Sequence, residues 1–241
     1  MTSLFIDRAI IEWERIEDDS YLLDIEAIRD VEEVDFRKEV TFFVGENGSG
    51  KSTLLEAIAV AYGFNPEGGT KNYSFSTYDS HSELCEAMRL SRGVRRPKAG
   101  YFLRAESFYN VATKEEEYSR EPGGTSLHLH ELSHGESFLA MAQNYFRGDG
   151  IYLLDEPEAA LSPQRQLTLL MEIDRCRREG AQFIIVTHSP ILLGLTDAEI
   201  LSFDDGQIHP IEYEDTDSFM ITSMFINDRE RLLRQLLGET E

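Results

Sequence analysis

A glycine-rich segment between an apolar run and a helical pattern constrains the fold of this chain most. The apolar run is residues 40–44, and Gly45, Gly50, Lys51 and Ser52 follow it with the spacing of a P-loop. Glycines let several backbone N–H groups turn towards one anion, and a helix N-terminus adds the positive end of its dipole. The sequence therefore predicts strand, phosphate-binding turn and helix. A glycine-rich turn without a ligand is the alternative, which the strand and helix on either side disfavour.

Two residues of this loop have separate predicted tasks. Lys51 is expected to reach the β- and γ-phosphates of a nucleoside triphosphate, and the Ser52 hydroxyl is expected to ligate Mg²⁺. The loop as a whole predicts these ATP-binding residues: Gly45, Glu46, Asn47, Gly48, Ser49, Gly50, Lys51, Ser52 and Thr53.

A second constellation supplies carboxylates. The apolar run 151–154 suits a strand buried on both faces, and it ends in Asp155 and Glu156. Asp155 is expected to hold Mg²⁺, directly or through water, and Glu156 to polarise the water that attacks the γ-phosphate.

Composition and charge limit the remaining choices. With 241 residues, 41% of them hydrophobic, the chain can form one large domain with a core, and it has no apolar run long enough to span a bilayer. The N-terminus lacks the features of a secretory signal, so we expect a cytoplasmic location and no direct insertion into a membrane. Cys85 and Cys176 lie far apart and form no CxxC pair, which predicts small core residues.

The formal net charge of −22 disfavours nucleic acid as a partner, because such a field repels phosphate backbones. One basic cluster keeps that alternative open. We favour a solvated surface that balances nearby acids over a contact with nucleic acid or another partner. The cluster is Arg89, Arg92, Arg95, Arg96, Lys98 and Arg104.

Hydrophobic periodicity predicts the other elements. Strands are expected at residues 3–13 and 21–25, forming a small sheet with 40–44, and also at 99–105, 151–154 and 183–186, with a hairpin of 200–203 and 208–211. Helices are expected at 52–63, 82–90, from 136 onwards, and at 162–178, 216–226 and 228–237. Trp13 or Tyr21 could stack on adenine, although packing in the core or on the surface is favoured.

These motifs, in this order, resemble the ABC-type ATPase superfamily. Residues 132–136 (LSHGE) resemble its signature, 155–162 (DEPEAALS) resemble Walker B with the D-loop, and His188 stands where the switch histidine belongs. The loop 45–53 and the signature are most similar to small ATPases of the RecF and SMC branch. Only about 80 residues separate P-loop and signature, too few for long coiled-coil arms.

The resemblance implies an α/β fold of the P-loop NTPase type. Its mainly parallel central sheet would be flanked by helices, with N-terminal antiparallel β strands and a small helical signature lobe. The whole chain, 1–241, would be one ABC-type ATPase domain. Its nucleotide-binding lobe would comprise about 1–65 and 149–241, and its signature lobe about 66–148.

The resemblance also implies an ATP-dependent homodimer in which ATP lies between two copies. One copy would supply Lys51, Ser52, Asp155 and the catalytic pair Glu156 and His188. The other would supply its signature residues, Ser133, His134, Gly135 and Glu136.

Two departures from the family pattern affect this expectation. His134 replaces the first glycine of the signature pair, and no glutamine follows strand 99–105 as the family's Q-loop would have it. Glu106 is expected either to stand in near the metal and the water or to be a surface carboxylate.

Three functions remain open at this point. The favoured one is a soluble ATPase that hydrolyses ATP and acts as a switch on an unknown partner protein, in genome maintenance or defence. The alternatives are a DNA-binding repair ATPase of RecF or SMC type and the nucleotide-binding subunit of an ABC transporter.

Overall fold

The computed structural model describes residues 4–70, 82–104 and 134–238. Its framework is a seven-stranded sheet in the order β10-β9-β3-β8-β7-β6-β4. The members are β3 (Val40–Val44), β4 (Gly69–Thr70), β6 (Ala99–Leu103), β7 (Gly150–Asp155), β8 (Gln182–Val186), β9 (Glu199–Ser202) and β10 (His209–Pro210). The five inner strands run parallel, and β4 and β10 pair antiparallel at the edges. The predicted mainly parallel sheet is confirmed.

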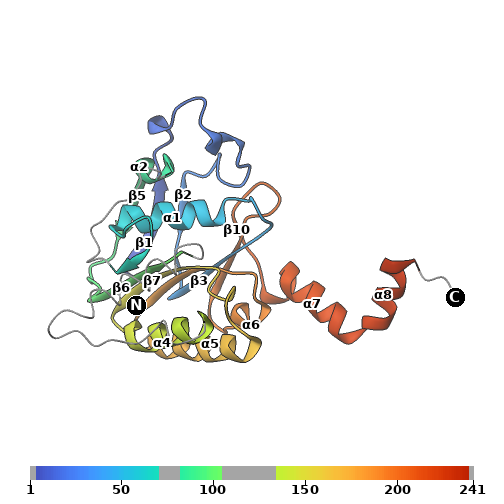
Figure 1. Ribbon diagram of the computed structural model, residues 1–241. Helices are drawn as coiled ribbons and strands as arrows, with labels where there is room; N and C mark the ends of the chain where they lie inside the picture. Colours follow the sequence, from blue (N-terminus) through green and yellow to red (C-terminus); the bar gives the residue numbers. More distant parts are fainter. Residues whose placement is uncertain (1–3, 71–81, 105–133, 239–241) are drawn as a thin grey trace.

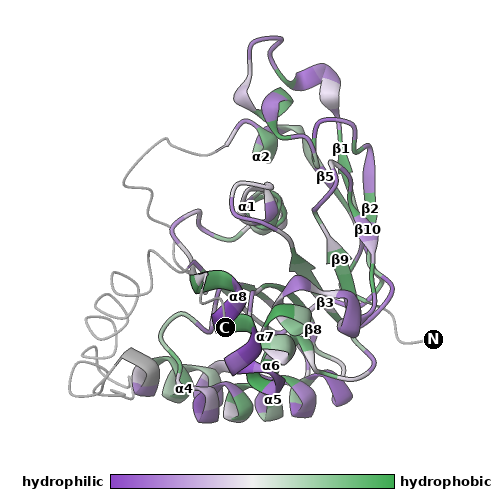
Figure 2. Cartoon of the chain, turned by 90° about the vertical axis from the view of Figure 1, so that its right-hand side faces the viewer, coloured by the Kyte–Doolittle hydropathy of each residue, from purple (hydrophilic) through white to green (hydrophobic). Residues whose placement is uncertain are grey.

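Helices cover both faces of this sheet (Figure 2). One face carries α1 (Lys51–Tyr62); the other carries α4 (His134–Tyr145), α5 (Pro163–Arg178) and α6 (Pro190–Leu193). Alternate strand residues separate two cores. Phe43 and Ile184 pack towards α1, whereas Phe42 and Ile185 pack towards α4 and α5. The continuous apolar strands in the sequence are therefore buried on both faces.

A second, three-stranded sheet lies beyond α1 (Figure 1). It contains β2 (Glu33–Asp35), β1 (Ile6–Ile11) and β5 (Met88–Arg92), all antiparallel. This confirms N-terminal antiparallel strands. The predicted small sheet of 3–13, 21–25 and 40–44 is wrong, because β1 and β3 belong to different sheets.

Two element predictions are wrong in detail. Residues Tyr21–Asp24 form a 3₁₀ helix, η2, because the Ser20 Oγ caps it by accepting the Leu22 N–H and only Leu22 of this turn is buried. The predicted helix 82–90 shortens to α2 (Leu84–Ala87), after which β5 pairs with the edge of β1. Two further 3₁₀ turns are η1 (Trp13–Arg15) and η4 (Tyr213–Asp215).

The last two helices leave the body of the molecule. Helices α7 (Asp217–Asn227) and α8 (Arg229–Leu237) follow the β9–β10 hairpin and project away from the sheets (Figure 1). The hairpin and both helices are confirmed as predicted. The strands β5 and β6 fall inside the range expected for the signature lobe, yet they pair in the two sheets; the division into lobes stays a prediction.

No helix among the described residues combines the length and the apolar character that crossing a bilayer requires.

Candidate functional site

The glycine-rich loop joins β3 to α1 as the sequence predicts. Gly45, Gly48 and Gly50 have φ values of 137°, 85° and 95°, in the region that favours glycine. A Cβ on Gly50 would collide with the side chain of Ile28, and one on Gly45 would lie 2.9 Å from Asp204 Oδ1. Two of these glycines are therefore required both by their backbone conformation and by close neighbours.

Lys51 is the first residue of α1, and its side chain lies back across the loop. Its Nζ donates to Gly45 O at 2.7 Å and to Glu46 O at 2.6 Å, and only 4% of the residue is exposed. Burial lowers the pKa of the Lys51 ammonium, while the carboxylates of Asp204 and Glu156 act in the opposite direction. ATP phosphates at this loop would compete with two carbonyls for the same ammonium.

The predicted metal ligands meet at the end of β7. Ser52 Oγ donates to Asp155 Oδ1 at 2.8 Å, which brings together residues 103 positions apart. A hydroxyl and a carboxylate are suitable ligands for Mg²⁺, which takes its remaining oxygens from phosphates and water. Within the described ranges no group of three or more His, Cys, Asp or Glu could hold a metal. The Ser52 hydroxyl and the Asp155 carboxylate thus fit as two ligands of a magnesium ion.

Glu156 follows Asp155 at a sharp turn of the backbone. Its φ of 45° is in the left-handed region, which is uncommon for a residue with a side chain. The Glu156 N–H donates to Val186 O at 3.0 Å, and its carbonyl accepts from the Ala159 N–H. Both the Asp155 and the Glu156 carboxylate act electrostatically on the Lys51 ammonium, so both lie on the side of the glycine-rich loop.

His188 lies just after β8, and a residue of the D-loop segment holds its backbone. The His188 N–H donates to Glu158 Oε1 at 2.6 Å. His188 Nε2 and Glu158 Oε2 are both buried without a hydrogen-bond partner in the part of the chain that the structure describes. Buried polar atoms without partners are costly, so these two atoms favour a further ligand or donor at this position.

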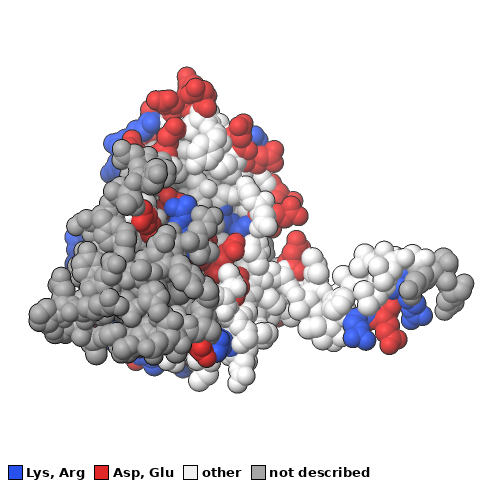
Figure 3. Space-filling model, in the orientation of Figure 1, with Lys and Arg blue, Asp and Glu red and all other residues white. Residues whose placement is uncertain are grey.

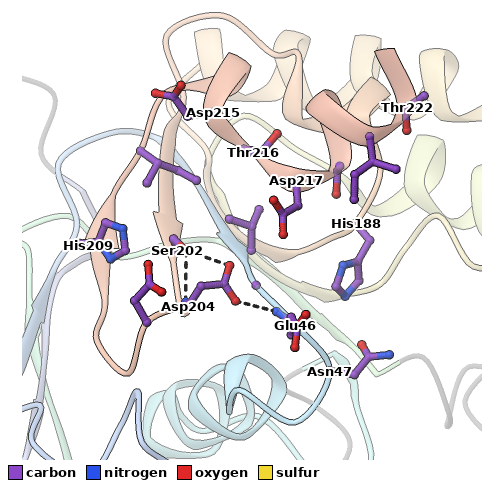
Figure 4. A pocket seen from close by; sticks show the side chains of 16 residues that line it. Glu46, Asn47, His188, Ser202, Asp204, His209, Asp215, Thr216, Asp217 and Thr222 are labelled. Atoms are coloured by element: carbon purple, nitrogen blue, oxygen red, sulfur yellow. Dashed lines mark hydrogen bonds between the residues drawn. The ribbon is translucent and has the colours of Figure 1, made fainter. Parts of the chain in front are cut away.

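A cavity of about 1030 Å³ adjoins the loop (Figure 4). Its wall includes Glu46 and Asn47 of the loop, His188, and residues of the β9–β10 hairpin and α7. Asp204 lies at its floor: Oδ1 accepts the Glu46 N–H at 2.9 Å, and Oδ2 accepts from the Ser202 hydroxyl at 3.1 Å. The hairpin therefore fixes the first turn of the glycine-rich loop.

The signature residues fall only partly within the described residues. Ser133 and Glu106 lie outside them, and His134 and Gly135 begin α4. Glu136 forms an ion pair with Arg165 of α5 at 2.8 Å. This pair is in the helical layer on the face of the sheet opposite α1 (Figure 2).

Neither aromatic residue considered for adenine stacking lines the cavity. The Trp13 Nε1–H donates to Val31 O at 2.8 Å, and the ring packs against the core. Tyr21 donates through its hydroxyl to Ser82 Oγ at 2.9 Å. Both residues have the packing roles that the sequence favoured.

The basic cluster is largely engaged within the chain. Arg89 pairs with Glu12 at 2.8 Å and Lys98 with Asp149 at 3.0 Å. The Arg92 guanidinium lies over the Tyr62 ring of α1, and the Arg95 guanidinium lies over the Phe5 ring. Arg104 forms an ion pair with Glu56 at 3.4 Å. These partners agree with a surface that balances nearby acids.

Sequence reasoning missed two residues of the site, Asp204 and Glu158. Asp204 follows the buried strand β9 at its carboxyl end, where open α/β sheets place ligand-binding residues. This signal was available in the sequence, although the segment 204–206 also has the composition of a simple turn. Glu158 gave no local signal, because its partner is 30 residues away.

Comparisons with known proteins agree with this geometry. One family model, an AAA domain, matches residues 21–123. A second, an AAA domain named for the AbiEii toxin of type IV toxin–antitoxin systems, matches residues 86–194.

Curated relatives include a ribose import ATP-binding protein, RbsA, from Bacillus cereus, which is 29% identical over 62% of this chain and 34% of its own length. A phosphate import ATP-binding protein, PstB 1, from Vibrio vulnificus is 28% identical over 77% of this chain and 76% of its own length. The chain thus spans about a third of the length of the ribose import protein.

Similar solved structures include an ATP-binding cassette of an ABC transporter, with 19% identity, a TM-score of 0.47 and coverage of 95% of this chain and 98% of that one. The SMC head domain from Thermotoga maritima has 19% identity, a TM-score of 0.43 and coverage of 75% and 93%.

The two family models, the relatives and the ordered motifs around one site show the class of this protein. The chain belongs to the ABC-type ATPase superfamily. Members of this superfamily bind ATP and in general hydrolyse it.

Proposed function

We propose that this chain binds ATP with Mg²⁺, hydrolyses it, and acts as a nucleotide-dependent switch on a partner protein. The observation that carries the proposal is the contact between Ser52 Oγ and Asp155 Oδ1 beside the buried ammonium of Lys51. A cation, a hydroxyl and a carboxylate at the end of a parallel sheet suit a magnesium nucleotide.

Residue roles follow from these positions. Lys51 and the loop amides would hold the β- and γ-phosphates, and Ser52 and Asp155 would hold Mg²⁺. Glu156, next to Asp155 at the end of β7, would polarise the attacking water. His188 would donate from its partnerless Nε2 to the γ-phosphate. Positioning and charge stabilisation would supply most of the rate enhancement.

The second face of the nucleotide would come from another copy. Residues 133–136 have the signature pattern, and Glu136 lies in the helical layer away from α1, so the same chain does not bring it to its own loop. ATP held between Lys51 of one copy and Ser133 of the next would stabilise the pair, because ligand that binds only the associated form favours that form.

The test uses two substitutions with different expected signatures. Lys51→Ala is expected to weaken ATP binding by at least about 10-fold, since the phosphates lose their cation. Glu156→Gln is expected to keep ATP affinity and to lose phosphate release. Calorimetry and a phosphate-release assay measure the two quantities. Unchanged ATP affinity in Lys51→Ala, or full turnover in Glu156→Gln, would contradict the assignment.

The names of the curated relatives favour a second candidate, the ATP-binding subunit of an import system. That function requires a membrane-embedded partner, so stable co-purification with a membrane protein would support it. A repair ATPase acting on DNA has less support, because the basic cluster on which it depends is engaged by acids and rings within the chain.

A further inference from the structure

The helices α7 and α8 form an arm, residues 217–237, that the other described residues leave largely exposed. Neither helix contains a buried residue, although both are rich in large apolar side chains. Seven of these side chains are between 41% and 72% exposed: Met220, Ile221, Met224, Phe225, Ile226, Leu236 and Leu237. A helix that is apolar on most of its surface is normally a buried helix.

The apolar area on the arm is of the size that a stable interface needs. At roughly 200 Å² for a fully exposed large side chain, the seven residues offer on the order of 800 Å² per copy. A standard interface buries about 800 Å² on each partner, and larger exposed apolar patches mark contact sites. The arm therefore has the dimensions of one half of an interface.

The net charge of the arm favours a second copy of this chain as its partner. Within the arm, three arginines stand against three acids, so the arm is neutral in a chain whose net charge is −22. Two whole copies repel each other, because both carry strong negative charge. Contact through two neutral arms that project from the bodies would keep the acidic bodies apart (Figure 1). Figure 3 shows the charged residues of α8 on one side of the arm and uncharged residues on the other.

Symmetry favours the same occupant. A second copy presents an identical apolar strip, and two such strips can pack about a twofold axis, with each arm making the same contacts in return. The stripe of Leu232, Leu233, Leu236 and Leu237 has the spacing of one helix face, as in the seams of helical bundles. Both helices of each arm would then be buried.

We propose that the arm pairs with the arm of a second copy, and that this contact forms without nucleotide. This contact is separate from the proposed ATP sandwich, which requires ATP and the signature residues 133–136. The base of the arm adjoins the cavity beside the glycine-rich loop, since Asp217, Ile221 and Thr222 line it together with Glu46 (Figure 4). Arm pairing would thus hold two nucleotide sites in one particle before ATP arrives.

The test is the solution mass without nucleotide. Light scattering of the full chain at tens of micromolar, in nucleotide-free buffer with a chelator, is expected to give twice the 27.5 kDa of one chain. Ile226→Asp, at a position that is 72% exposed, is expected to give the mass of one chain. The matched control is Met171→Asp on α5, 71% exposed, which is expected to keep the doubled mass.

Three results would overturn the proposal. They are a single-chain mass for the unmodified protein, a doubled mass that persists in Ile226→Asp, and dissociation by Met171→Asp as well. If the arm instead binds a different protein, the unmodified chain alone gives a single-chain mass, which is the first of these results. Circular dichroism and ATP binding check that the variants fold. Failure of arm pairing can be distinguished from failure of the proposed ATP sandwich, because the sandwich contact forms only with ATP and arm pairing is measured without it.

Discussion

The side chain of Gln182 joins the two sheets, and its removal gives a stability effect that can be worked out from the structure. Gln182 begins β8 and is 1% exposed. Its Oε1 accepts the N–H groups of Phe5 and Ile6, each at 2.9 Å, and its Nε2 donates to Ile6 O at 2.8 Å. Strand β8, which pairs with β3 just before the glycine-rich loop, is thereby tied to the N-terminal sheet.

Gln182→Ala leaves two buried N–H groups and one carbonyl without partners. Each costs about 1–3 kcal/mol, and partial entry of water lowers the sum, so we expect the free energy of unfolding to fall by about 3–5 kcal/mol. With a urea m-value of about 3 kcal/mol/M, the midpoint would fall by about 1–2 M.

The assay is urea unfolding followed by circular dichroism. Gln164→Ala on the exposed surface of α5 is the matched control and should shift the free energy by less than about 0.5 kcal/mol. A shift in Gln182→Ala no larger than in this control would refute the reasoning, because the three backbone groups would then be satisfied in another way.

Three further predictions concern the site and its surroundings. Gly50→Ala should lower ATP affinity and the melting temperature, since a Cβ would collide with Ile28 at a positive φ; calorimetry and thermal unfolding measure this. Glu158→Ala should lower kcat more than ATP affinity, because His188, the proposed γ-phosphate donor, loses the acceptor of its N–H; Glu158→Gln, which keeps an acceptor, should restore kcat. Burial raises the pKa of the Cys85 thiol to about 12 and that of Cys176 to about 11, above the ordinary 9.0. The unfolded chain therefore releases these protons first. The contribution of the two thiols to the free energy of unfolding is therefore complete below pH 9 and is lost as the pH rises towards 11–12. Denaturant titrations at pH 8 and above pH 10 would detect this loss as a lower free energy of unfolding at the higher pH.

Local sequence signals predicted the glycine-rich loop and its helix well. The φ values of Gly45 and Gly50 and the position of Gly63 after α1 follow from residue type alone. The contact of Ser52 with Asp155 was predictable because parallel strands place their carboxyl ends at one edge.

The errors arose where distant partners decide the structure. Residues 88–92 form a strand, and not the end of a helix, because they pair with the edge of β1. The position of Asp204 after β9 was a signal in the sequence, but the loop that it binds lies 158 positions away and is set by the tertiary structure.

The measurement that tests the ATP sandwich most directly is the solution mass of Glu156→Gln with and without ATP and Mg²⁺. Ile226→Asp is added so that arm pairing does not contribute. The expected result is a single-chain mass without nucleotide and a doubled mass with ATP, reversed when Ser133→Arg is introduced. A single-chain mass in the presence of bound ATP would contradict a sandwich formed by two copies of this chain.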